Sequence, residues 1–110
     1  MKSALILVTA AVLTLAHAEA GDMKGDTRKG RELAQTECSQ CHRVTRAAVP
    51  PGILYTGPAF SDVANSARIT PTSLFVFLRS SHPPMPNIAL SQQETADLVA
   101  YIISLRRTRL

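Results

Sequence analysis

Residues 38–42 of the chain read Cys-Ser-Gln-Cys-His. Two cysteines separated by two residues, with a histidine directly after the second, form the pattern of covalent haem attachment. The thiols of Cys38 and Cys41 can add across the two vinyl groups of one haem, and His42 can then offer a ring nitrogen to the iron. The spacing therefore predicts one covalently bound haem c, with Cys38 and Cys41 as its thioether residues and His42 as an axial ligand.

Two other kinds of site use the same residue types. A dithiol redox motif also has two residues between its cysteines, but it normally stands in a βαβ context, which this sequence lacks. A structural zinc ion takes four ligands, and Cys38, Cys41, His42 and His82 together make four. The haem interpretation is favoured, and zinc stays open as an alternative.

A six-coordinate haem needs a second axial ligand. Met85 stands between Pro84 and Pro86, and these prolines limit the freedom of the loop that carries it. A thioether held in this way suits haem iron. His82 is the chemical rival, because imidazole also binds haem iron strongly. We expect Met85 to be the second ligand.

Length and composition restrict the possible classes of protein. The chain has 110 residues, of which 5% are aromatic, and it contains no tryptophan. This length allows one domain, and a core with so few aromatic side chains is expected to lean on a disulfide, a metal or a cofactor. No phosphate-binding glycine motif is present, and the chain is too short for a Rossmann or barrel enzyme.

The formal net charge of +4 includes three arginines at the end of the chain, Arg106, Arg107 and Arg109. We interpret them as a solvated helix terminus, where cations are favourable, in preference to a docking patch for an acidic partner. The sequence shows no basic stripe, so no nucleic-acid partner is expected.

Residues 1–18 have the features of a secretory signal peptide. Lys2 precedes an apolar run over residues 4–16, and Ala16-His17-Ala18 forms a cleavage site between small residues. The run is too short to span a bilayer comfortably, since a span needs about 20 residues, although an uncleaved membrane anchor is the alternative. We expect export to the periplasm, with no stable membrane insertion after cleavage.

Helix signals follow in the rest of the chain. Asp26 is expected to cap a helix over residues 27–37, and Thr70-Pro71 is expected to start a helix over residues 71–80. Proline and glycine make residues 43–60 a loop, and a short helical turn is expected at residues 61–67.

The last helix is expected to start at the capping box of Ser91 and Glu94 and to run to about residue 105. Its apolar face consists of Leu98, Tyr101, Ile102 and Leu105. Its opposite, polar face consists of Gln93, Asp97 and Ser104. No alternating strand pattern is present, so we predict an all-α fold with three main helices and long loops.

From about residue 30 to residue 105 the chain resembles the class I monohaem cytochromes c. The resemblance rests on the order and spacing of five elements, each weak alone except the second: Gly30, the CSQCH motif, Gly57-Pro58-Ala59-Phe60, Met85-Pro86, and Leu98-Val99-Ala100-Tyr101-Ile102-Ile103-Ser104-Leu105.

The resemblance implies a cytochrome c fold that wraps one covalently bound haem, with the first and last helices crossing. Gly30 would permit the close approach there, facing Leu98 and Tyr101. The carbonyl of Pro58 would accept a hydrogen bond from His42, and Met85 would be the distal ligand to the iron.

The chain departs from the family at Ala34, where many members carry an aromatic residue, so the crossing is expected to pack less tightly or to be filled by another side chain. Tyr55, Arg46 and Arg68 are only candidates for contacting the haem propionates.

Together these features predict a periplasmic electron carrier rather than an enzyme. It would shuttle single electrons between a donor dehydrogenase and an acceptor oxidase or reductase, as a monomer. Two alternatives remain: a dedicated electron-transfer subunit of one dehydrogenase or oxidase complex, and a gas-binding haem sensor with a displaceable sixth ligand. The expected division is a signal peptide (1–18), a flexible lead-in with the helix start (19–29) and a cytochrome c domain (30–110).

Overall fold

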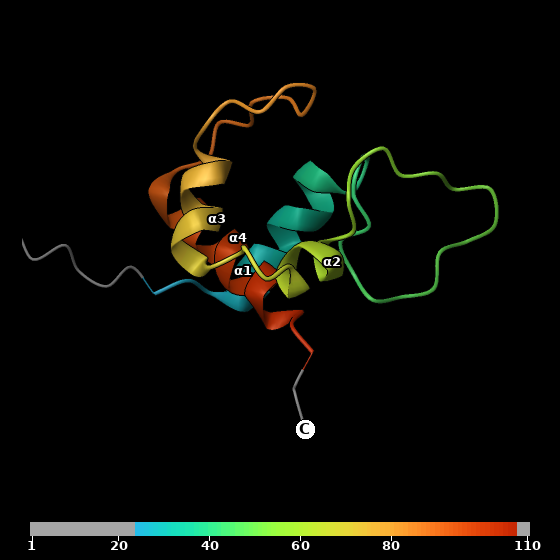
Figure 1. The fold of residues 1–110 in the computed structure, drawn as a ribbon, viewed down its shortest axis with the longest axis horizontal. Helices are drawn as coiled ribbons and strands as arrows, with labels where there is room; N and C mark the ends of the chain where they lie inside the picture. Colours follow the sequence, from blue (N-terminus) through green and yellow to red (C-terminus); the bar gives the residue numbers. More distant parts are fainter. Residues whose placement is uncertain (1–23, 108–110) are drawn as a thin grey trace, which may run out of the picture.

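The computed structural model describes residues 24–107. The expected signal peptide, residues 19–23 of the expected lead-in, and Arg109 lie outside the described residues. The helices are α1 (Thr27–Leu33), the π-helical turn η1 (Ala34–Cys38), α2 (Phe60–Asn65), α3 (Pro71–Leu78) and α4 (Gln92–Ser104). Residues 24–107 contain no strand, and Figure 1 shows the helices gathered around α4. The prediction of an all-α fold is confirmed.

Helices α1 and α4 cross at a glycine. Gly30 is buried, and a Cβ atom built on it would lie 1.9 Å from the backbone oxygen of Asp97 and 2.9 Å from the Cβ atom of Tyr101. Only a residue without a side chain allows the two backbones to approach this closely. The expected close approach at Gly30 is therefore present, although its nearest neighbour is the Asp97 backbone, which sequence reasoning did not name.

The three expected helix starts are present with their caps. Asp26 accepts a hydrogen bond from the Lys29 amide, which holds the pKa of this carboxyl below its usual range. Thr70 and Ser91 each open a capping box, on α3 and α4 respectively, and Pro71 stands in the first turn of α3. Caps depend on residues three positions apart, which is why the sequence alone predicts them well.

The helix that leads to the cysteine motif changes character halfway along. Sequence analysis predicts one helix over residues 27–37, but after Leu33 the chain widens into the π-helical turn η1. Thr36 donates its hydroxyl to the carbonyls of Glu32 and Leu33, and Ser39 donates to the carbonyl of Gln35. Such hydroxyl bonds compete with the regular backbone pattern, and single π turns often occur at functional sites.

The core lies where α4 meets the other helices. Ala34 has no exposed surface, and Leu98, Tyr101 and Ile102 of α4 are buried with it. The Tyr101 hydroxyl donates to the carbonyl of Val44, so that the polar end of this buried ring is satisfied. The predicted apolar face of the last helix is confirmed.

The predicted polar face of that helix is wrong at Asp97, whose side chain is only 4% exposed. Its Oδ1 atom accepts hydrogen bonds of 2.8 Å from the amide of Asp26 and 2.8 Å from Nε2 of Gln93. Gln93 also donates to the carbonyl of Lys24. Residues 24–26 thus lie against α4 and cover Asp97, and this long-range contact has no counterpart in the spacing of polar residues along the helix.

Arg106 and Arg107 are exposed at the end of α4, in agreement with the interpretation as a solvated helix end. Arg106 has fixed partners as well. Its guanidinium donates to the carbonyls of Ala64, at 3.0 Å, and Ile69, at 2.6 Å. The amide of Arg107 donates to Oδ1 of Asn65. These bonds tie the end of α4 to α2 and to the segment that follows α2. The carbonyl of Ala64 can accept such a bond because the last carbonyls of a helix, here α2, lack partners within the helix.

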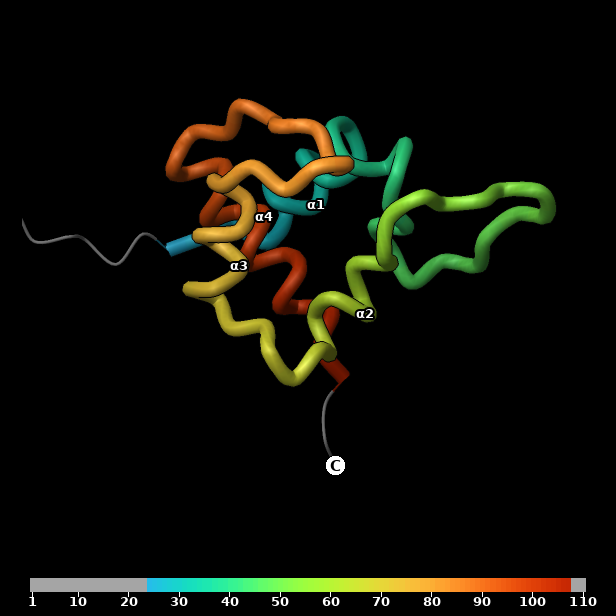
Figure 2. Tube along the Cα trace, turned by 45° about the horizontal axis from the view of Figure 1, so that its top comes forward, coloured from blue at the N-terminus to red at the C-terminus, as the bar shows by residue number. Residues whose placement is uncertain are grey.

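Two long loops leave this helical group. Figure 1 shows residues 43–59 projecting away from the helices, and Leu54 on this loop is 92% exposed. The second loop, residues 80–91, arches from the end of α3 to the beginning of α4, as the orange part of the trace in Figure 2 shows. Both loops carry residues of the expected site.

Within residues 24–107, no helix combines the length and the apolar character needed to cross a membrane.

Candidate functional site

The CSQCH motif forms a closed turn at the end of η1. The carbonyl of Cys38 accepts hydrogen bonds from the amides of Cys41, at 3.2 Å, and His42, at 2.9 Å. The amide of Gly57 donates to the carbonyl of Cys41 at 2.8 Å, which fixes the far end of loop 43–59 to the motif. The turn holds the two thiols and the imidazole on one short, hydrogen-bonded segment.

The imidazole of His42 is held on three sides. Its Nδ1 atom lies 2.7 Å from the carbonyl oxygen of Pro58, and its ring lies 5.2 Å from the ring of Phe60, centre to centre. A carbonyl oxygen can only accept, so Nδ1 carries a proton, and in the neutral ring Nε2 then keeps a free lone pair. A nitrogen with a free lone pair, on a ring oriented by a backbone carbonyl, is the arrangement that metal-binding histidines use.

Gly57 forms the third side of this cradle. A Cβ atom on Gly57 would lie 2.4 Å from Cε1, 2.7 Å from Nδ1 and 2.9 Å from Nε2 of His42. Sequence reasoning quoted Gly57 and Phe60 as parts of a motif but did not assign either a contact with His42. Their positions beside Pro58, which was assigned one, were the signal that could have found them.

Replacing Gly57 with alanine is therefore expected to push the imidazole out of its position. Over-packing of this kind costs about 1–3 kcal/mol, and a displaced ring alters the haem spectrum and the reduction potential as well as stability. Absorption spectra, potentiometry and denaturant unfolding of the holoprotein measure the three effects. Thr56→Ala, at the exposed neighbouring residue, serves as the control and should change none of them. A Gly57→Ala protein with the parent spectrum and potential would contradict the steric argument.

The two cysteines differ in environment. Both are free, Cys38 being buried and Cys41 exposed. Burial, together with the charge of Glu37, raises the pKa of the Cys38 thiol to about 11. A thiol with a raised pKa is a weak nucleophile in its unmodified form, because the thiolate is the reactive form.

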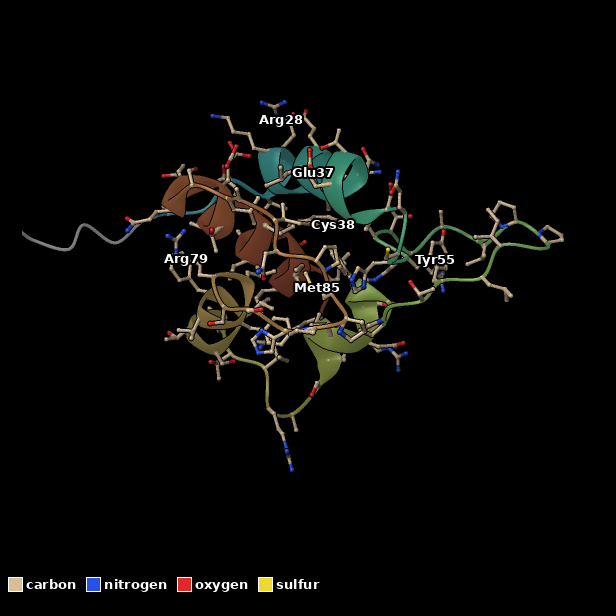
Figure 3. The ribbon with its side chains drawn as sticks, turned by 90° about the horizontal axis from the view of Figure 1, so that it is seen from above. Arg28, Glu37, Cys38, Tyr55, Arg79 and Met85 are labelled. Carbon is tan, nitrogen blue, oxygen red and sulfur yellow. The ribbon has the colours of Figure 1, made fainter. Side chains whose placement is uncertain are left out.

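A cavity of about 230 Å³ lies between η1 and loop 80–91. Cys38, His82 and Met85 all line it, together with Leu33 of α1 and Leu98 of α4. Figure 3 shows Cys38 and Met85 in the same central region of the molecule, although they come from distant parts of the chain. His42, Pro58 and Cys41 do not line this cavity. Cys38 and Met85 thus share the cavity, His42 and Pro58 are joined by their hydrogen bond, and the CSQCH turn, which includes Cys41, connects the two pairs.

The loop that carries Met85 is held in part by His82. The His82 ring stacks on the ring of Phe77 with 3.7 Å between their centres, and the Met85 amide donates to the His82 carbonyl at 2.9 Å. An imidazole stacked in this way has a packing role of its own, which sequence analysis did not foresee for the rival ligand.

Within the described residues, no group of three or more histidine, cysteine, aspartate or glutamate side chains is arranged to hold a metal ion. The set proposed for zinc is thus not assembled in this structure. Two free thiols, an imidazole oriented by a backbone carbonyl, and a thioether that lines a cavity with one of the thiols instead form the set of groups that suits a covalently bound haem.

The three candidates for propionate contacts stand on different segments of the chain. Arg46 donates to the carbonyls of Leu105 and Arg106 and so caps the end of α4. Arg68 is exposed between α2 and α3, and Tyr55 is half-buried on the projecting loop, where Figure 3 labels it.

Comparison with known proteins agrees with this set of groups. The family model described as cytochrome c oxidase, cbb3-type, subunit III matches residues 25–102. Cytochrome c-552 of Bradyrhizobium diazoefficiens is 35% identical over 96 residues, which cover 86% of this chain and 89% of that protein. A cytochrome c-553-like protein of Synechocystis sp. is 30% identical over 83 residues, covering 76% of this chain and 72% of that protein. No solved structure matches the chain. With the haem motif, the all-α fold and these relatives in agreement, the chain belongs to the family of small monohaem c-type cytochromes, which bind haem c covalently.

Proposed function

We propose that this haem-based electron carrier works in the periplasm, with His42 and Met85 as the two axial ligands, and passes single electrons between a donor dehydrogenase and an acceptor oxidase or reductase. The observation that supports the proposal is the cavity that Cys38 and Met85 both line. The bound haem would supply the iron, which takes up and gives back one electron.

The residues of the chain have separate tasks in this proposal. Cys38 and Cys41 hold the cofactor covalently, so that it is not lost between partners. The Pro58 carbonyl keeps the proton on Nδ1 of His42 and leaves Nε2 for the iron. Met85 would supply its thioether as the second ligand to the iron, which would raise the potential and leave no open site for a substrate.

Partner proteins are proposed to dock beside Cys41. This cysteine is exposed, and the neighbouring loop 43–59 carries exposed apolar side chains at Val49, Ile53 and Leu54. Encounters between electron-transfer proteins are weak and use small interfaces. A small apolar surface near the cofactor is suited to form such an interface.

Absorption spectra of the holoprotein test the proposal. The protein is expressed together with periplasmic haem-attachment machinery, and spectra are recorded oxidised, reduced, and reduced with carbon monoxide. We expect a c-type spectrum when reduced, a methionine-to-iron charge-transfer band when oxidised, and no response to carbon monoxide. A rapid response of the unmodified protein to carbon monoxide would contradict the proposed ligand set and favour the gas sensor. Absence of bound haem would contradict the proposal as a whole.

A further inference from the structure

Loop 80–91, which carries Met85, has little backbone structure of its own. Within this loop, all of which is described, the single backbone hydrogen bond is the one from the Met85 amide to the His82 carbonyl. The ends of the loop are the C-cap residue of α3, Arg79, and the N-cap residue of α4, Ser91. Besides this backbone bond and the stacking of His82 on Phe77, the position of the Met85 sulfur depends on contacts that hold the two ends of the loop together.

Arg79 is placed to hold these ends together. Its Nη1 atom donates to the carbonyl of Leu90, at 3.2 Å, and lies 3.4 Å from Oγ1 of Thr95. Its guanidinium carbon also lies 5.8 Å from the centre of the Phe75 ring. One side chain at the start of the loop thus contacts the end of the loop and the first turn of α4, and Figure 3 shows Arg79 there.

Thr95 of α4, which accepts from Arg79, is itself well fixed. Thr95 has no exposed surface, and its hydroxyl donates to the carbonyl of Ser91 at 2.7 Å. Arg79 and Leu90 both line the cavity that Cys38 and Met85 share. A guanidinium presents several donors in a rigid plane, which lets it serve two acceptors on different segments at once.

We propose that Arg79 is a positioning residue for Met85: by joining the two ends of loop 80–91, it keeps the loop closed over the cavity and the Met85 sulfur in the axial position. The proposal rests on the proposed ligation by Met85 and adds the residue that maintains it. No part of it requires Arg79 to touch the cofactor.

Displacement of Met85 by an added ligand measures how firmly the loop is closed. Oxidised holoprotein is titrated with imidazole, which binds the iron only when Met85 has left it. The apparent affinity is therefore proportional to the fraction of molecules with an open loop. Losing one or two hydrogen bonds changes such a fraction by about tenfold. We expect Arg79→Gln to bind imidazole about tenfold more tightly than the parent, with a weaker methionine-to-iron band.

The matched control is Arg28→Gln. Arg28 is an arginine on α1 whose only described ion pair is an exposed one with Glu32, and its loss should leave the imidazole affinity unchanged. Arg79→Lys keeps the charge but not the planar set of donors, so an intermediate affinity is expected. Thr95→Val removes one acceptor of the Arg79 side chain and should also make imidazole bind more tightly. The double variant with Arg79→Gln and Thr95→Val should show less than the sum of the two single effects.

A purely structural role would give a different result. If Arg79→Gln lowered the denaturant midpoint of the holoprotein but left the imidazole affinity and the methionine band unchanged, the positioning role would be wrong. Failure of the proposed ligation is distinguishable, because the unmodified protein would then lack the methionine band altogether. A protein that has this band, and in which Arg79→Gln and Arg28→Gln bind imidazole equally, would overturn the inference about Arg79 alone.

Discussion

Replacing Met85 with alanine is expected to lower the reduction potential of the holoprotein by on the order of 0.1–0.3 V, a part of the roughly 0.8 V over which axial ligands set haem potentials. A thioether stabilises the reduced iron relative to water or nitrogen ligands. The same change removes the side chain that the proposal places in the sixth position, so the reduced variant is expected to bind carbon monoxide rapidly. Potentiometry and carbon monoxide difference spectra measure the two effects.

Met85→His serves as the matched variant. An imidazole in place of the thioether should also lower the potential, yet keep the iron six-coordinate and unresponsive to carbon monoxide. The pair of variants thus separates loss of the methionine from opening of the site. An unchanged potential in Met85→Ala, together with no binding of carbon monoxide, would exclude Met85 as a ligand and return attention to His82, which lines the same cavity.

Replacing Gly30 with alanine is expected to destabilise the whole fold. The new Cβ atom would lie 1.9 Å from the Asp97 backbone oxygen, and backbone atoms cannot give way as the end of a flexible side chain can. Helices α1 and α4 would have to separate, and the neighbouring contacts of Asp97 with residues 24–26 would be disturbed as well. We expect a loss of about 3 kcal/mol, which for a domain of this size lowers the melting temperature by about 12–24 °C.

Gly52→Ala provides the comparison for this prediction. Gly52 has a φ of +85°, and nothing lies within 4 Å of the Cβ position built on it. Alanine at this position strains only the backbone, which should lower the free energy of unfolding by about 1 kcal/mol. Thermal unfolding of both holoproteins, followed by circular dichroism, gives the difference. Equal melting temperatures for the two variants would show that the crossing of α1 and α4 has more room than the structure indicates.

Several features of this protein follow from the sequence because they are local. The caps at Asp26, Thr70 and Ser91 each need only a hydroxyl or carboxylate a few positions ahead of the amides that it accepts from. The CSQCH motif is equally local, since five consecutive residues carry two thiols and an imidazole at the spacing that covalent haem attachment needs. The apolar face of α4 follows from helical periodicity.

The tertiary structure decided the features that depend on contacts between distant residues. Asp97 stands at a polar position of α4, but residues 24–26 cover it, and the Asp26 amide donates a hydrogen bond to its carboxylate. Arg106 is exposed, yet its guanidinium also donates to the carbonyls of Ala64 and Ile69. No spacing rule predicts either contact, because each partner lies more than thirty residues away along the chain.

The site divides in the same way. The sequence by itself predicted which side chains bind the haem: the thiols of Cys38 and Cys41, the imidazole of His42 and the thioether of Met85. Only the tertiary structure decided what lies against them, namely Gly57 and Phe60 beside the His42 ring and the Arg79 contacts across the ends of the Met85 loop, on which the proposed positioning role rests. The physical reason is that a binding group is a property of one side chain, whereas its position is set by the packing of segments that meet only when the chain folds.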